Sequence, residues 1–173
     1  MAAASVASAC ASAGKLGVGV AIAAVVALGT LLATSARAQQ PPANTFIAIL
    51  SPDAEVPACA AATSGAGGNF VAHVTDEATG TVEWKIVANN LPGTIVAAHI
   101  HLAPEGVAGP VVQPLPPTPG DESGIIATGS FSNPALLAGL RANPDGYYVN
   151  VHTTVCPAGA ARGQLGDHGP SNN

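Results

Sequence analysis

The sequence is poor in the residues that nucleic-acid-binding proteins and helical proteins use in quantity. Lys and Arg together number 5 among 173 residues, Asp and Glu together number 10, and charged residues make up 9% of the chain. So little positive charge excludes an electrostatic site for nucleic acid or an anionic membrane, although metal cations and cationic partners remain compatible. Lys and Leu-rich segments are scarce while Gly, Pro, Ala, Val and Thr are abundant, which favours strands and turns over helices.

Sequence motifs of the common enzyme classes are also absent. The chain has no Gly-x-Ser-x-Gly motif for a serine nucleophile and no glycine-rich loop that opens a helix for phosphate binding. Its carboxylates show no spacing that singles out an acid and a base. We therefore predict that the protein is not an enzyme.

The N-terminal segment has the pattern of a secretion signal. Lys15 is the only charge before an apolar run at residues 16–33, and Ala36-Arg37-Ala38 supplies the small residues of a cleavage site. We predict a cleaved signal peptide at residues 1–38 and a flexible spacer at residues 39–44. The alternative is an uncleaved membrane anchor, because a run of this length can just span a bilayer. In both cases the rest of the chain is secreted, periplasmic or otherwise extracellular.

Short alternating runs separated by turn residues predict a single all-β domain at residues 45–166. The spacing is typical of a β-sandwich or barrel, and "DEATGTVEW" is its clearest hairpin. Residues 167–173 contain too little apolar material to pack, so we expect a disordered tail there. The eight predicted strands are Thr45–Leu50, Asn69–Thr75, Thr81–Ala88, Ile95–Leu102, Gly109–Val112, Ile125–Phe131, Tyr147–Thr153 and Ala161–Leu165.

One short helix is predicted within "SNPALLAGLRANPDG". Asn133 can cap its first turn, and Pro134 suits the first helical position. The leucines that follow form an apolar stripe at helical spacing. We expect this helix to be a crossover between two sheets, and we assign it no chemistry.

The cysteines indicate one disulfide bond. Cys10 lies in the predicted signal, which leaves Cys59 and Cys156, and two cysteines outside the cytoplasm allow one intramolecular pairing. A bridge that closes a loop of roughly 100 residues contributes about 4 to 5 kcal/mol in the chain-entropy model. The alternative is a pair of free, buried thiols.

Two segments offer histidines on one face of a strand. Alternate residues of a strand share a face, so His99 and His101 point the same way in "AAHIHLA". In "YYVNVHTT", Tyr148, Asn150 and His152 likewise share a face. If the two strands are neighbours, His99, His101 and His152 can converge, and three imidazoles are the minimum set for a copper or zinc site with an open position.

A structural role for these histidines is the competing interpretation. In that case they bond loop carbonyls and stabilise the Gly-Pro turn that follows His101. His73 in "NFVAHVTD" is a distant candidate for a fourth ligand, although a single strand histidine is usually a surface residue.

Three blocks of the sequence, taken in order, resemble the CHRD domain family, which is named after chordin and also occurs in bacterial secreted proteins. They are "FIAILSPDAEVP" at Phe46–Pro57, "AAHIHLAPEGVAGPVV" at Ala97–Val112 and "GYYVNVHTTVCPAGAARGQL" at Gly146–Leu165. The order of Glu-Val-Pro, His-Ile-His, Gly-Pro-Val-Val, Tyr-Val-Asn-Val-His-Thr and Arg-Gly-Gln is specific, although each piece alone is weak. The chain is similar to single-domain bacterial members of the family.

The resemblance implies an immunoglobulin-like Greek-key β-sandwich of about eight short strands with one crossover helix. It also implies a binding or interaction module, since chordin-type proteins are extracellular regulators that bind growth factors. We therefore predict a secreted or envelope-associated binding module for an unknown protein or metal ion. One alternative is a copper or zinc binding protein that uses His99, His101 and His152, and a further alternative is a purely structural envelope protein. Within the motifs, Glu55, Asn150 and Arg162 are expected to be structural, and Glu55 and Arg162 are candidates for an ion pair. The family often has an acidic residue before Arg-Gly-Gln, where this chain has Ala160 and Ala161.

The histidine pair also resembles the start of the copper site in copper-zinc superoxide dismutases, which are Greek-key sandwiches too. The remaining ligands of those enzymes are not recognisable in this sequence, so their activity does not carry over.

Overall fold

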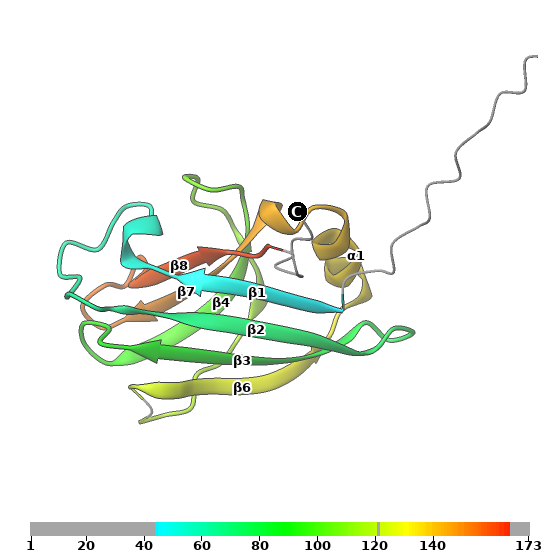
Figure 1. Ribbon diagram of the computed structural model, residues 1–173, viewed down its shortest axis with the longest axis horizontal. Helices are drawn as coiled ribbons and strands as arrows, with labels where there is room; N and C mark the ends of the chain where they lie inside the picture. Colours follow the sequence, from blue (N-terminus) through cyan, green and yellow to red (C-terminus); the bar gives the residue numbers. More distant parts are fainter. Residues whose placement is uncertain (1–43, 121, 167–173) are drawn as a thin grey trace, which may run out of the picture. The chain divides into compact units, whose positions relative to one another are not determined.

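Two four-stranded antiparallel sheets form the part of the chain that the computed structural model describes, residues 44–120 and 122–166 (Figure 1). The first sheet has the order β1-β2-β3-β6 and the second the order β5-β4-β7-β8. The strands are β1 (Thr45–Leu50), β2 (Gly67–Asp76), β3 (Thr81–Asn89), β4 (Ile95–Leu102), β5 (Val111–Pro114), β6 (Gly124–Ser132), β7 (Tyr147–Thr153) and β8 (Ala161–Gln164). The predicted all-β sandwich with one short helix is confirmed.

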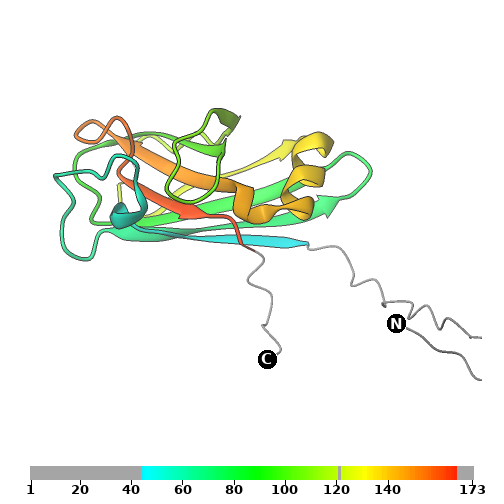
Figure 2. The same cartoon turned by 90° about the horizontal axis from the view of Figure 1, so that it is seen from above.

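The chain passes between the sheets three times. β3 leads to β4 in the second sheet, β5 returns to β6, and β6 leads through the helix α1 (Pro134–Ala142) to β7. The edge strands β1 and β8 come together through backbone bridges from Ile47 to Gly166 and from Ser51 to Arg162. In both views α1 lies at the same end of the strands as the β2–β3 turn (Figure 2).

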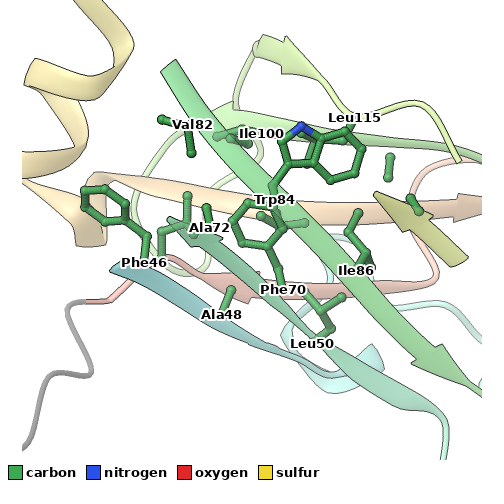
Figure 3. Close-up of a cluster of buried hydrophobic side chains, with 14 of the residues drawn as sticks. Phe46, Ala48, Leu50, Phe70, Ala72, Val82, Trp84, Ile86, Ile100 and Leu115 are labelled. Atoms are coloured by element: carbon green, nitrogen blue, oxygen red, sulfur yellow. The ribbon is translucent and has the colours of Figure 1, made fainter. Parts of the chain in front are cut away.

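The core lies between the sheets because each strand alternates buried and exposed residues. In β3, Val82, Trp84, Ile86 and Ala88 are buried and the residues between them face outward. Side chains of β1, β2 and β3 pack with Ile100 of β4 and with Leu115 (Figure 3). Five side chains from different strands are almost completely inaccessible: Phe46, Phe70, Ile86, Ile100 and Val149.

The strand boundaries follow the sequence prediction closely except at β5. The sequence predicts a strand at Gly109–Val112, but the strand is Val111–Pro114. Gly109 and Pro110 belong instead to the preceding loop, where the Gly109 N–H bonds the Tyr148 hydroxyl at 3.1 Å. Pro110 has no N–H to give to a ladder.

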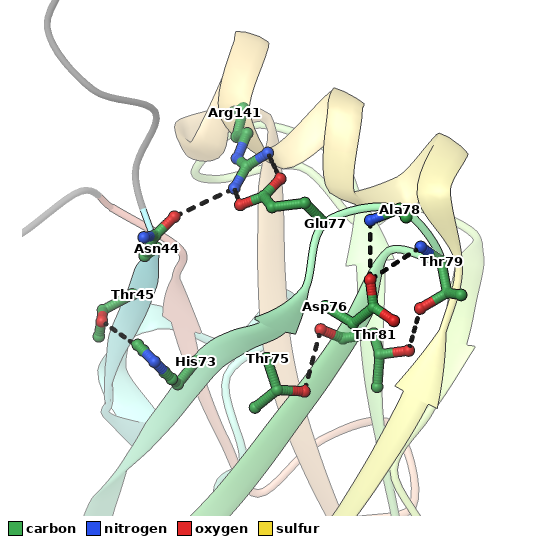
Figure 4. Close-up of polar contacts among 10 residues, drawn as sticks. All are labelled: Asn44, Thr45, His73, Thr75, Asp76, Glu77, Ala78, Thr79, Thr81 and Arg141. Carbon is green, nitrogen blue, oxygen red and sulfur yellow. Dashed lines mark hydrogen bonds and ion pairs between the residues drawn. The ribbon is translucent and has the colours of Figure 1, made fainter.

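The helix α1 starts and ends where the sequence predicted a crossover. The Asn133 side chain accepts a bond from the Leu136 N–H at 3.0 Å, and Pro134 occupies the first turn. The helix is tied to the β2–β3 turn by Arg141, whose guanidinium bonds the Glu77 carboxylate at 2.6 Å (Figure 4). Both side chains are partly exposed, so solvent screens this ion pair and it adds little stability.

The Cys59–Cys156 disulfide is present, as predicted, and its two Cα atoms are 5.8 Å apart. It joins the loop after the short 3-10 helix η1 (Pro52–Ala54) to the turn between β7 and β8. These two segments lie at the end of the strands opposite α1 (Figures 1 and 2). The bridge therefore fixes the loops at one end of the outer face of the second sheet.

The predicted signal peptide at 1–38, residues 39–43 of the predicted spacer and the predicted tail at 167–173 lie outside the described residues. Among residues 44–120 and 122–166, no helix has the length and hydropathy of a membrane span.

Candidate metal centre

The outer face of the second sheet carries polar side chains in register across β4 and β7. His99 is opposite Asn150, His101 is opposite Tyr148, and Ala97 is opposite His152. Antiparallel partners lie on the same face of a sheet, so this register puts all three histidines on one surface. The neighbouring strands on which the predicted convergence of the histidines depends are therefore present.

The three histidine rings meet above this face. His99 Nδ1 lies 3.1 Å from His152 Nε2, and the ring centroid of His101 is 5.6 Å from that of His99. One nitrogen from each ring lies within 4.8 Å of the others. Nitrogens that share one tetrahedral zinc ion are about 3.3 Å apart, given bonds of about 2.0 to 2.1 Å. Ring movements of about 1 Å would close the cluster around an ion.

Two loop carbonyls determine which ring nitrogen of His101 and of His152 carries the hydrogen and which carries the lone pair. His101 Nδ1 lies 2.9 Å from the carbonyl oxygen of Gly109, and His152 Nδ1 lies 3.0 Å from that of Pro157. A carbonyl only accepts, so both Nδ1 atoms carry hydrogen and both Nε2 atoms present lone pairs. A bond from the second ring nitrogen to a carbonyl is the usual support of a metal-binding histidine.

His99 completes the set through its Nδ1 atom. Because His152 Nε2 carries a lone pair, the His99 Nδ1–H donates to it. If the hydrogen of His99 moves to its own Nε2 atom, His99 Nδ1 also carries a lone pair. The cluster then offers Nδ1 of His99 with Nε2 of His101 and His152.

The His101 Nε2 atom is the clearest sign of a missing partner. It is buried and has no hydrogen-bond partner, in a residue that is 7% exposed. A buried lone pair without a donor costs about 1 to 3 kcal/mol, so a buried acceptor is normally satisfied. A metal ion satisfies a lone pair in the way that a donor does.

The surroundings favour the neutral form of all three imidazoles. Burial lowers the pKa of His99, and the neighbouring His152 and His101 lower it further. Burial also lowers the pKa of His101, and this outweighs the opposing effect of the Gly109 carbonyl. The pKa of His152 is lowered by burial, against the opposing effect of the Pro157 carbonyl. Neutral imidazole is the form that binds metal.

Tyr148 and Arg162 support His101 from the side. The rings of His101 and Tyr148 are stacked, with centroids 4.7 Å apart and planes 10° apart. The Arg162 guanidinium carbon lies 3.4 Å from the Tyr148 ring centroid, a cation–π contact. Strand periodicity predicts that Tyr148 lies on the histidine face, but the sequence contains no signal for its contacts with His101 and Arg162.

The expected ion pair between Glu55 and Arg162 is wrong. Within the described residues their charged groups do not come within 4.0 Å, and Arg162 instead donates to the carbonyls of Val107 and Pro104, each at 2.8 Å. These carbonyls belong to the loop at residues 103–110, which connects β4 to β5. Arg162 is therefore the anchor of that loop.

Glu55 and Asn150 form a separate buried contact on the same face. Asn150 Nδ2 donates to Glu55 Oε2 at 3.1 Å, and both side chains are about 95% buried. Burial raises the pKa of Glu55 to about 7, against smaller opposing effects of the Arg162 charge, the Val56 N–H and the Asn150 amide.

His73 does not join the cluster. It lies on β2, in the other sheet, where its exposed ring is 3.2 Å from the Thr45 hydroxyl (Figure 4). The fourth-ligand interpretation of His73 is therefore wrong.

An apolar groove of about 580 Å³ lies beside the loop at residues 103–110. Leu102 and Val107 line it and are 45% and 49% exposed. The groove and the histidine cluster thus share this loop, since the Gly109 carbonyl bonds His101.

Comparison with known proteins gives one match. The family model described as CHRD domain matches residues 46–165. No curated protein and no solved structure matches the chain.

Proposed function

Because the chain belongs to the CHRD domain family, we propose that it is an extracellular binding module whose ligand is a transition-metal ion, copper or zinc. The ligands are His99, His101 and His152. At the level of the family, the domain is an extracellular interaction module. The Cys59–Cys156 disulfide fits a non-reducing compartment.

The buried, unpartnered Nε2 of His101 is the observation that carries the proposal. The structural interpretation accounts for the Nδ1 atoms of His101 and His152, which bond loop carbonyls. It leaves the lone pair of His101 Nε2 without a role. Three neutral imidazoles with one open position suit zinc or copper and not the hard cations calcium and magnesium, which prefer oxygen ligands.

Calorimetric titration of the metal-free protein with copper(II), and separately with zinc(II), tests the proposal. We expect one ion per chain. His99→Ala and His152→Ala should each weaken binding by at least tenfold, because two imidazoles remain of three. His73→Ala, a histidine of the other sheet, is the matched control and should bind like the wild type.

The proposal would be contradicted if the folded wild-type protein binds neither metal. It would also be contradicted if His73→Ala weakens binding as much as His99→Ala and His152→Ala do. The three histidines would then be structural, with their Nδ1 atoms holding the loops.

A partner protein is the second candidate ligand. The groove beside the loop at residues 103–110 favours it, because exposed apolar side chains gathered at a hollow mark interaction sites. If the metal titrations fail while the fold is intact, this surface is the remaining candidate for the family-level binding function. A purely structural envelope protein is the outcome if neither ligand binds.

A further inference from the structure

Two buried acceptor atoms without partners belong to Glu55 and Asn150, the residues that contact each other. Glu55 Oε1 and Asn150 Oδ1 have no hydrogen-bond partner, although their residues are only 5% and 4% exposed. The other atoms of the same two groups, Asn150 Nδ2 and Glu55 Oε2, are bonded to each other at 3.1 Å. The two groups are therefore joined by one bond and each retains one unsatisfied oxygen.

A single proton on Glu55 Oε1 would give both unpartnered oxygens a hydrogen bond. A protonated carboxyl has one O–H donor and one acceptor oxygen, and an amide has the complementary pair. With hydrogen on Glu55 Oε1, the carboxyl can donate to Asn150 Oδ1 while Oε2 accepts from Asn150 Nδ2. An ionised carboxylate only accepts, so it leaves the Asn150 oxygen without a donor.

We infer that Glu55 and Asn150 form a proton-binding site, a carboxylic acid paired with an amide, that is occupied in the folded protein. The site lies on the same face as the histidine cluster, with Asn150 opposite His99, but in the part of the chain that the structure describes no histidine bonds Glu55 or Asn150. It joins the segment after η1 to β7, and the Glu55 carboxyl also packs against Gly159 in the turn between β7 and β8.

Three polar groups, from β8, from the loop of Glu55 and from β7, act on the Glu55 carboxyl. From β8 the Arg162 guanidinium favours the ionised form, and from its own loop the Val56 N–H does the same. From β7 only the Asn150 amide acts on it. Burial outweighs these effects, so the pKa of Glu55 rises from 4.5 to about 7. A metal cation is a poor occupant of this site because the Arg162 charge repels it.

The unfolding equilibrium of the chelator-treated protein across pH 4 to 9 tests the inference. The folded pKa is raised, so the stability from the bound proton is complete below pH 4.5 and is lost as pH rises through about 7. The wild-type unfolding constant should therefore increase by up to about tenfold per pH unit between these values, relative to a variant that lacks the group.

Glu55→Gln is that variant, because its amide can make both contacts of the protonated acid at every pH. Its unfolding constant should lack the extra pH dependence, and it should be more stable than the wild type at pH 8. Glu83→Gln removes an exposed carboxylate of β3 and is the matched control, which should retain the wild-type pH dependence.

Carbon-13 NMR of the glutamate carboxyl groups gives a second measurement on the wild type, which holds even if Glu55→Gln does not fold. The resonance of Glu55 is assigned by replacing the other glutamates, Glu77, Glu83, Glu105 and Glu122, in turn. We expect it to titrate near neutral pH. Three outcomes would overturn the inference. The Glu55 resonance could titrate at an ordinary glutamate pKa, the stability of the wild type and of Glu55→Gln could have the same pH dependence, or the stability of the wild type could follow cation concentration instead of pH.

Discussion

Gly159 shows how tightly the polar residues of the second sheet are packed. Its φ is +151°, and an added Cβ would overlap both carboxyl oxygens of Glu55. The position therefore requires glycine for two reasons, backbone conformation and space. Gly159, three residues before Arg162, thus makes room for the carboxyl of Glu55, which lies about a hundred residues earlier in the sequence.

Gly159→Ala should lower the free energy of unfolding by about 2 to 4 kcal/mol, from backbone strain and from displacement of the buried carboxyl. Gly106→Ala is the control: its φ is +74°, but an added Cβ meets nothing within 4 Å, so only the strain of about 1 to 2 kcal/mol applies. Urea denaturation of both variants measures the difference. Equal losses would mean that Glu55 does not press on Gly159.

The histidines and the Glu55–Arg162 pair differ in how far their environments could be predicted. Strand periodicity and a neighbouring strand suffice to place His99, His101 and His152 on one face. The partners of Arg162 are backbone carbonyls of a loop, and carbonyls occur at every residue, so the sequence contains no signal for them. The predicted ion pair with Glu55 failed for this reason.

The loop at residues 103–110 is the element that connects the histidine cluster to the groove. Arg162 holds its start and its middle through the carbonyls of Pro104 and Val107, and Tyr148 holds its end through the Gly109 N–H. The Gly109 carbonyl in turn orients His101. The loop therefore fixes the tautomer that leaves His101 Nε2 free.

Tyr148→Phe keeps the ring stacked on His101 but removes the hydroxyl that bonds Gly109. We expect a loss of about 1 kcal/mol in the free energy of unfolding and faster hydrogen exchange at the Gly109 amide. Tyr147→Phe, at a half-buried neighbour that faces the helix α1, is the control and should leave exchange at Gly109 unchanged. Unaltered exchange at Gly109 in Tyr148→Phe would show that the hydroxyl does not hold the loop.

Elements flanked by clear turn residues were predictable, and elements whose ends are set by loop contacts were not. β1, β4 and β7 have the predicted bounds. Residues that favour turns flank them in the sequence: Pro52 after β1, Gly93 before β4 and Gly146 before β7. β2, β3 and β6 extend one or more residues beyond the prediction. β5 begins two residues later, because Gly109 bonds the side chains of His101 and Tyr148, and Pro110 has no N–H to give to a ladder.

At the scale of the whole molecule, the acidic composition and the fold restrict the function without identifying the ligand. The sequence predicted which histidines can meet, but their distances depend on the register of β4 and β7, which the structure supplies. Closure of the three rings around an ion would take movements of about 1 Å, a precision that residue patterns do not reach.

The Cys59–Cys156 disulfide links two segments 97 residues apart and holds the segment after η1 against the turn between β7 and β8. That turn contains Gly159, which packs on Glu55, and the Pro157 carbonyl, which orients His152. The bridge therefore acts both on the unfolded chain, whose entropy it lowers, and on the local geometry of the polar face. Both effects should appear when it is removed.

The double variant Cys59→Ala with Cys156→Ala should lose about 4 to 5 kcal/mol in the free energy of unfolding, because a closed loop of this length strongly restricts the unfolded ensemble. A small domain has about 5 to 15 kcal/mol in total, so the variant should be marginally stable. Urea denaturation of the variant and of chemically reduced wild type should agree, since both lack the same bond. A loss below about 1 kcal/mol would mean that the polar contacts alone hold the two segments together. Labelling of both thiols in the unreduced wild type would show that the disulfide does not form.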